Sequence, residues 1–104
     1  MPLTRSFKTT VMARVRRDPE FAEALLSEGI QHLLDGDVET GVVILRDYIN
    51  ATVGFEELAR ASGTNAKSLM RMFSPMGNPQ ARNLFPVLAK LQEMTNRQIA
   101  VKVA

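Results

Sequence analysis

A run of small polar and basic side chains between residues 64 and 71 has the composition of a surface that contacts nucleic acid. Lys67 and Arg71 are four residues apart, so on a helix they project from the same face. Arg71 could donate two hydrogen bonds to guanine O6 and N7, and Lys67 could do so less rigidly. The candidate residues of this run are Thr64, Asn65, Ala66, Lys67, Ser68 and Arg71.

The other members of the run suit different parts of a DNA duplex. Ala66 could give apolar contact to a thymine methyl, and the Ser68 hydroxyl could reach a phosphate oxygen or a base. Asn65 is expected to cap the helix, and the backbone at Thr64 and Asn65 would favour a phosphate. For each polar residue the alternative is an ordinary solvated helix surface.

Acidic and basic residues are segregated along the chain, although its formal net charge is only +2. Residues 1–17 and 58–104 are basic, whereas residues 18–57 hold nearly all of the acids. A polyanion would therefore be drawn to the two ends and repelled by the middle. Arg60 and Arg82 flank the candidate run, and they either contact phosphates or belong to a solvated face.

Two short helices joined by a tight turn are predicted to position these side chains. Phe55–Ala61 and Asn65–Phe73 have helical spacing, and Gly63 falls where a left-handed turn is needed. Ala59 must be small because the second helix crosses close to it. The sequence thus predicts a helix-turn-helix at residues 55–73, with an apolar seam formed by Leu58, Leu69 and Met72.

The segment ELARASGTNAKSLMRMFSPMGNP resembles the helix-turn-helix of phage-type repressors and of the bacterial Xre-like regulators. More narrowly it is similar to the addiction-module antidote proteins, antitoxin-like repressors with the layout LA…TG…LYRALSP.GNPT…L..VL.AL. The upstream stretch RDPEFAEALLSEGIQHLLDGD also fits that group, so the resemblance covers residues 17–94. It implies a repressor that reads the major groove with helix 65–73, and a toxin protein as a second partner.

Helix starts and stops are marked in the first half of the chain. Asp18 followed by Pro19 is a typical helix start, and Gly36 should end that helix. Asp37 should cap the next helix, which Gly54 stops. That helix is apolar on several sides, so we expect it to be the central, buried one.

The last helix should begin at Asn78-Pro79 with the same capping logic as Asp18-Pro19. Its apolar face should close the core beneath the second helix of the helix-turn-helix. Pro86 lies within this helix and should bend it, which departs from the leucine pattern of the similar proteins. The apolar face consists of Leu84, Val87, Leu88 and Leu91.

The sequence therefore predicts an all-α fold, a compact bundle of about five helices that contains a lambda-repressor-like helix-turn-helix. Residues 18–96 form the helical DNA-binding domain. Residues 1–17 are a basic segment that forms either a short helix or an arm along DNA. Residues 97–104 alternate with period two, which indicates either a short β-strand that pairs across a dimer or a frayed terminus.

An enzymatic function is not expected. The chain has no cysteine, and His32 is its single histidine, so no thiolate or paired-histidine metal site is predicted. The acids are scattered along solvent faces, and no glycine loop that would cradle a phosphate is present. We expect no catalytic residue, metal or cofactor. Its short apolar runs and the lack of a signal-peptide pattern predict a cytoplasmic protein without a membrane partner.

The combined expectation is a repressor that binds double-stranded operator DNA as a homodimer, with half-sites about 34 Å apart. The acidic half from Asp18 to Asp47 would suit a basic toxin. The alternative is a protein-interaction module that kept the same fold and no longer reads DNA. RNA binding is disfavoured because the chain offers no aromatic stacking platform.

Overall fold

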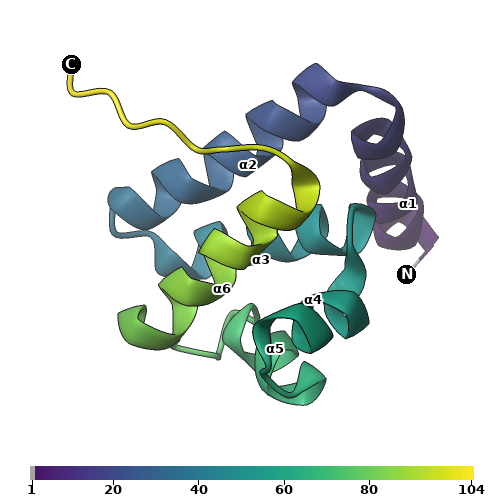
Figure 1. Cartoon of the computed structure of the whole chain (residues 1–104). Coiled ribbons are helices and arrows are strands. Elements are labelled where there is room, and N and C mark those ends of the chain that lie inside the picture. The colour runs from purple at the N-terminus through teal and green to yellow at the C-terminus, as the bar shows by residue number, and fades with distance from the viewer. Residues whose placement is uncertain (1) are drawn as a thin grey trace.

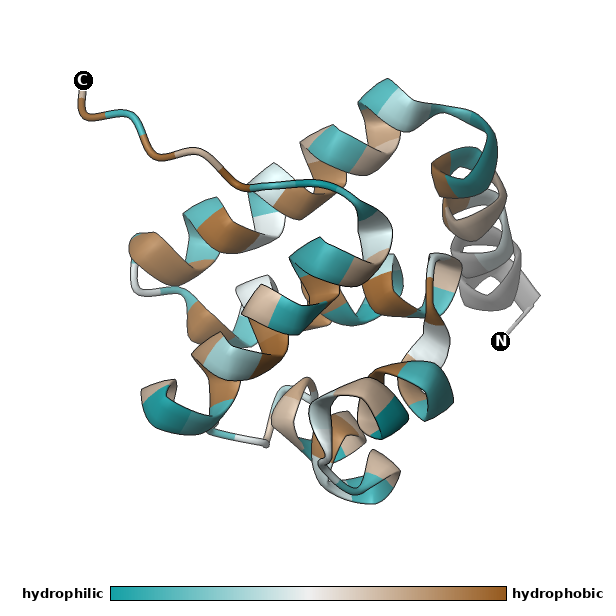
Figure 2. Cartoon of the chain, in the orientation of Figure 1, coloured by the Kyte–Doolittle hydropathy of each residue, from teal (hydrophilic) through white to brown (hydrophobic). Residues whose placement is uncertain are grey.

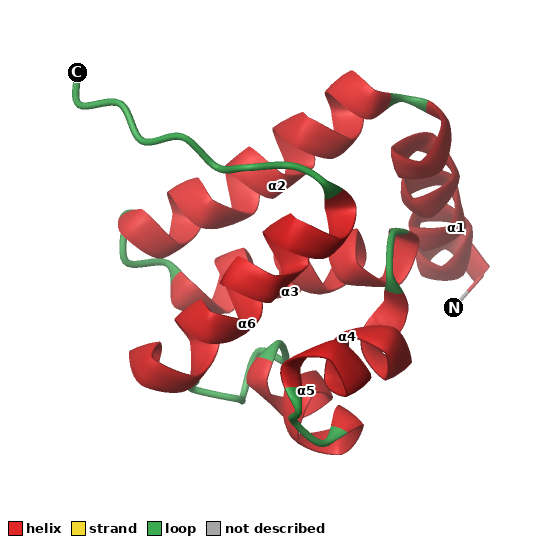
Figure 3. Ribbon diagram, in the orientation of Figure 1, coloured by secondary structure: helices red, strands yellow, loops and turns green. Residues whose placement is uncertain are grey.

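Six helices and the loops between them make up the computed structural model, which describes residues 2–104, with side chains from residue 9 onward (Figures 1 and 3). No strand occurs within residues 2–104, and the predicted all-α fold is confirmed. Of the two alternatives for the N-terminal segment, the helix is the one observed. The helices are α1 (Pro2–Arg17), α2 (Pro19–Leu34), α3 (Val38–Ala51), α4 (Gly54–Ser62), α5 (Ala66–Met72) and α6 (Ala81–Thr95).

Helices α2 and α3 make the most extensive helix–helix contact, and two glycines let their backbones approach closely. A Cβ atom on Gly41 would lie 2.9 Å from the carbonyl oxygen of Gly29. A Cβ atom on Gly29 would lie 2.8 Å from Cγ of Leu45, a wholly buried side chain on α3. Neither helix can therefore carry a larger residue at these positions without moving away from the other.

Aspartate caps start both of these helices, as predicted. Asp18 Oδ1 accepts the backbone N–H of Phe21 at 3.2 Å, and Asp37 Oδ1 accepts that of Thr40 at 3.3 Å. The hydrogen bonds from Thr40 lower the pKa of the exposed Asp37 carboxyl, and nearby His32 lowers it further. These caps satisfy amide groups that the helices themselves leave unpaired.

The core forms around α3, and the apolar faces of α2, α3 and α6 meet in the interior (Figure 2). Each residue of the predicted apolar face of α6 is buried, which confirms that this helix closes the core. The Phe55 and Phe73 rings lie 6.0 Å apart and join the helix-turn-helix to the same core. The side chains that are wholly buried include Val42, Leu45, Tyr48, Ile49, Leu58, Leu69, Phe73 and Leu91.

Helix α1 packs on the rest of the domain through one side. Val15 is buried, and Val11 and Met12 pack against the core. The Nε–H of Arg16 donates to the carbonyl oxygen of Ala51 at 3.2 Å, at the end of α3. These contacts hold the C-terminal half of α1 against the other helices.

The predicted start of α6 at Asn78-Pro79 is wrong. The helix begins at Ala81, and the residue before it makes no side-chain cap. Asn78 adopts a positive φ of 45° because the loop turns back toward α5. A Cβ atom on Gly77 would lie 1.9 Å from the carbonyl oxygen of Arg71, so Asn78 forms part of this turn and does not cap the helix.

Helix α6 continues through Pro86, whose side chain is exposed.

The C-terminal tail, residues 97–104, is coil in the described single chain, and the predicted strand that pairs across a dimer stays a prediction. An all-helical domain offers no strand edge with which the tail could pair. The tail instead crosses from the end of α6 toward α2 and then leaves the domain (Figure 1). Its first residues are fixed there, since Arg97 donates to the Tyr48 hydroxyl at 3.1 Å and Ile99 packs against the core.

We expect Gly41→Val to lower the free energy of unfolding by about 1–3 kcal/mol, because its side chain would be forced against the Gly29 backbone. Ser27→Val introduces the same residue on the exposed side of α2 and should change stability by less than about 0.5 kcal/mol. Urea denaturation followed by circular dichroism measures both. Equal stability of the two variants would contradict the close approach of α2 and α3.

Candidate nucleic-acid interface

A left-handed turn at Gly63 joins α4 to α5 and sets the angle between them. Gly63 has a φ of 72°, as its predicted role requires. The N–H groups of Gly63 and Thr64 both donate to the carbonyl oxygen of Ala59, at 2.9 and 3.2 Å. The predicted seam is also confirmed, since Leu58 and Leu69 are wholly buried and Met72 packs against the core. The two helices therefore form one rigid unit.

The start of α5 is capped by Asn65, as predicted. Its Oδ1 accepts the backbone N–H of Lys67 at 2.8 Å and that of Ser68 at 3.3 Å. Because the Thr64 N–H already donates to Ala59, three of the amide groups at this end are occupied within the chain. The Thr64 N–H of the predicted backbone phosphate site is thus already engaged within the chain, and a phosphate contact at Thr64 and Asn65 stays a prediction.

Lys67, Ser68 and Arg71 are exposed on the outer side of α5. Neither Lys67 nor Arg71 has an ion-pair partner among the side chains that the structure describes. Ala66 is half-buried and lies on the same side of the helix as Leu69. The structure thus brings Lys67, Ser68 and Arg71 together on an open surface and withdraws Ala66 partly from it.

Of the two flanking arginines, the structure brings one to α5. Arg82 on α6 lines a surface groove together with Thr64 and Ser68. Arg60 forms an ion pair with Glu57 one turn earlier on α4, so its charge is offset within the chain. The two arginines that looked equivalent in the sequence therefore have different surroundings.

Sequence reasoning missed three polar residues of α6 and the loop before it. Lys90 lines the same groove as Arg82, and its Nζ lies 3.2 Å from Glu93. Gln80 and Asn83 line a second groove, next to Ser68 and Arg71. The sequence spacing could have indicated Lys90, because residues 82, 86 and 90 follow one another at four-residue intervals along one face of α6.

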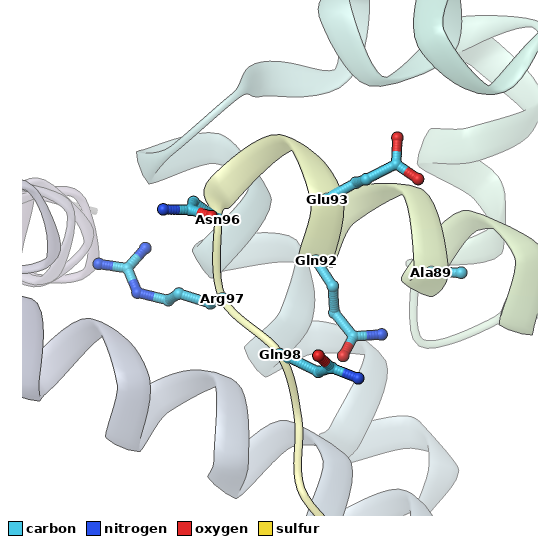
Figure 4. A pocket seen from close by; sticks show the side chains of 6 residues that line it. All are labelled: Ala89, Gln92, Glu93, Asn96, Arg97 and Gln98. Atoms are coloured by element: carbon cyan, nitrogen blue, oxygen red, sulfur yellow. The ribbon is translucent and has the colours of Figure 1, made fainter.

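Few features of the described chain suggest other chemistry. No group of three or more acidic or histidine side chains from residue 9 onward could hold a metal ion. None of the helices within residues 2–104 is both long and apolar enough to cross a membrane. Another surface hollow lies around the end of α6 and the tail, where Gln92 and Arg97 point in different directions (Figure 4).

The chain was compared with protein-family models, curated proteins and solved structures, and none of them matches it.

Removing the cap of α5 should weaken the helix without touching its outer surface. We expect Asn65→Ala to lower the free energy of unfolding by about 1 kcal/mol, because the Lys67 and Ser68 amides lose their acceptor. Asn65→Asp keeps an oxygen in the same place and should retain the native denaturation midpoint. A midpoint shift of equal size in both variants would show that this oxygen does not hold α5.

Proposed function

We propose that this chain is a sequence-specific DNA-binding transcriptional regulator that reads the major groove with α5. The observation that carries the proposal is the outer side of α5, which follows a glycine turn. On it Lys67 and Arg71 are exposed and have no ion-pair partner among the side chains from residue 9 onward. Side chains that read bases must be free to leave the protein surface, and long basic side chains match the acceptors of guanine. The motif resemblance at residues 57–79 supports the same function.

In this proposal the residues of the surface have separate tasks. Arg71 contacts guanine O6 and N7, and Lys67 contacts a neighbouring base. Ser68 donates to a phosphate or a base. Arg82, on the groove between α5 and α6, contacts a phosphate and fixes the register of the protein on the duplex.

The proposed regulator represses transcription as a homodimer on a two-fold symmetric operator. A protein with this function would act in the cytoplasm. The resemblance to antidote proteins adds a toxin as a second partner. Acidic residues on α2, α3 and the turn between them would bind a basic toxin surface. The acidic residues of this stretch are Asp18, Glu20, Glu23, Glu28, Asp35, Asp37, Glu39 and Asp47.

A second candidate function is that of a protein-interaction module with the same fold. Large exposed apolar side chains on α5, on α6 and in the loop between them favour it, because DNA recognition has no need for them. Met70 on α5 is 46% exposed, Met76 in the following loop is 90% exposed, and Phe85 on α6 is 57% exposed. The two functions differ in salt dependence, since DNA affinity falls steeply as salt displaces the phosphate contacts.

Fluorescence anisotropy with a duplex from the upstream region of the gene, at two salt concentrations, tests the proposal. We expect Arg71→Ala to weaken binding by about tenfold to a hundredfold and to reduce discrimination among duplex sequences, because a bidentate base contact is lost. Arg17→Ala on α1 removes the same charge from another part of the surface and serves as the matched control.

Two outcomes would overturn the proposal. Equal effects of Arg71→Ala and Arg17→Ala, without any sequence preference, would leave only a general affinity for polyanions. No binding at low salt would exclude DNA reading by the protein alone and would favour the protein-interaction module.

A further inference from the structure

The C-terminal tail is held by specific contacts at its beginning. The Arg97 guanidinium donates to the hydroxyl of Tyr48 at 3.1 Å, and its Nε lies 3.9 Å from Glu23 on α2. The backbone N–H of Ile99 donates to Gln92 Oε1 at 2.6 Å, and the Ile99 side chain packs against the core. Because these contacts come from α2, α3 and α6, the direction in which the chain leaves the domain is fixed.

Beyond Ile99 the tail runs away from the helices as an extended ribbon in which hydrophobic and hydrophilic residues alternate (Figure 2). Val101 is 83% exposed and Val103 is 91% exposed. No hydrogen bond joins the backbone of residues 100–104 to another described residue. An extended segment with free backbone groups and alternating β-branched residues is an open strand edge, which readily pairs with another chain.

We propose that the tails of two copies of this chain pair as antiparallel β-strands centred on Val101. In an extended strand, alternate residues present their backbone groups to the same edge. Ile99 directs its N–H toward α6, so Ala100 and Lys102 present theirs to the opposite, outer edge. Pairing along this outer edge leaves the anchoring contact of Ile99 intact.

The register follows from the sequence of the tail. With Val101 on the two-fold axis, Val103 lies opposite Ile99 of the second copy and Lys102 lies opposite its Ala100. Apolar residues then meet apolar residues, and no like charges oppose one another. A register centred on Lys102 would place the two ammonium groups face to face. This self-complementarity is the reason that the partner is a second copy.

The contacts of Arg97 and Ile99 also stabilise the proposed two-stranded ribbon. Such a ribbon is marginally stable in water because ordering two free chains costs conformational entropy. Here each strand is already fixed at its beginning by Arg97 and Ile99, which lowers that cost.

The tail leaves the domain on the side away from α4 and α5, so pairing keeps the outer side of α5 open (Figure 1). The inference deepens the proposed function and rests on it only for the role of the dimer at an operator.

Single cysteines test the pairing cleanly, because the natural chain contains none. Val101→Cys should form a covalent dimer with oxidised glutathione, since the two positions lie about 4.5 Å apart across a non-hydrogen-bonded pair. Val103→Cys is the matched control, and its two copies would lie four residues apart along the ribbon, about 13 Å, beyond disulfide reach. Equally fast crosslinking of both variants would overturn the register.

Sedimentation equilibrium of the cysteine-free chain provides the second test. The natural chain should have twice the monomer mass at micromolar concentration, and Val101→Asp should have the monomer mass, because two carboxylates would meet at the axis. A natural chain that stays monomeric, or a Val101→Asp variant that stays dimeric, would overturn the proposal. Anisotropy with a single half-site is read in parallel. If the monomeric Val101→Asp variant still binds the half-site, the tail is needed for the dimer and not for DNA binding. If the natural chain is a dimer that does not bind DNA, the proposed function is contradicted and the tail pairing is not.

Discussion

The contact between the backbones of α2 and α3 is the constraint on which the other helices depend. With no side chain on Gly29 or Gly41, the two helices approach until Leu45 lies directly over Gly29. This fixes α3 in the middle of the domain, where its remaining faces are available to α1 and α4 and to the core side chains of α6. Tyr48 and Ile49 are wholly buried as a result. The position of the helix-turn-helix is thus set by a contact between helices that precede it in the chain.

Helix α5 is too short to be stable by itself and is held at both of its ends. A helix of seven residues has little intrinsic stability in water. Its start is fixed by the Gly63 turn and the Asn65 cap, and its end by the approach of Gly77 to the Arg71 carbonyl. Buried Leu69 fixes its inner side. Stability therefore comes from the two ends and the inner side, and the outer side contributes nothing that the fold requires.

The features that sequence predicted well are local ones. The Asp18 and Asp37 caps, the Gly63 turn and the apolar face of α6 each follow from a few neighbouring residues, and each is present. The error at the start of α6 involves a contact between a loop and the helix before it. Asn78 looked like a cap because its neighbours are typical of one, but the close approach of Gly77 to α5 decides its conformation.

The candidate surface shows the same division between local and distant effects. The exposure of Lys67 and Arg71 could be predicted from helical spacing alone. The half-buried position of Ala66 and the approach of Arg82 to Thr64 and Ser68 depend on how α4, α5 and α6 pack. For the tail, the alternating pattern predicted either a β-strand that pairs across a dimer or a frayed terminus, but it could not reveal that Tyr48 and Gln92 hold the beginning of the tail.

The independence of the outer side of α5 from the fold has a consequence for how the protein can change over generations. Lys67, Ser68 and Arg71 use their side chains in no hydrogen bond or ion pair with the described part of the chain. Their replacement therefore leaves the core, the cap and the turn untouched. A lineage that carries this fold can explore new binding preferences by point substitution without first acquiring compensating mutations.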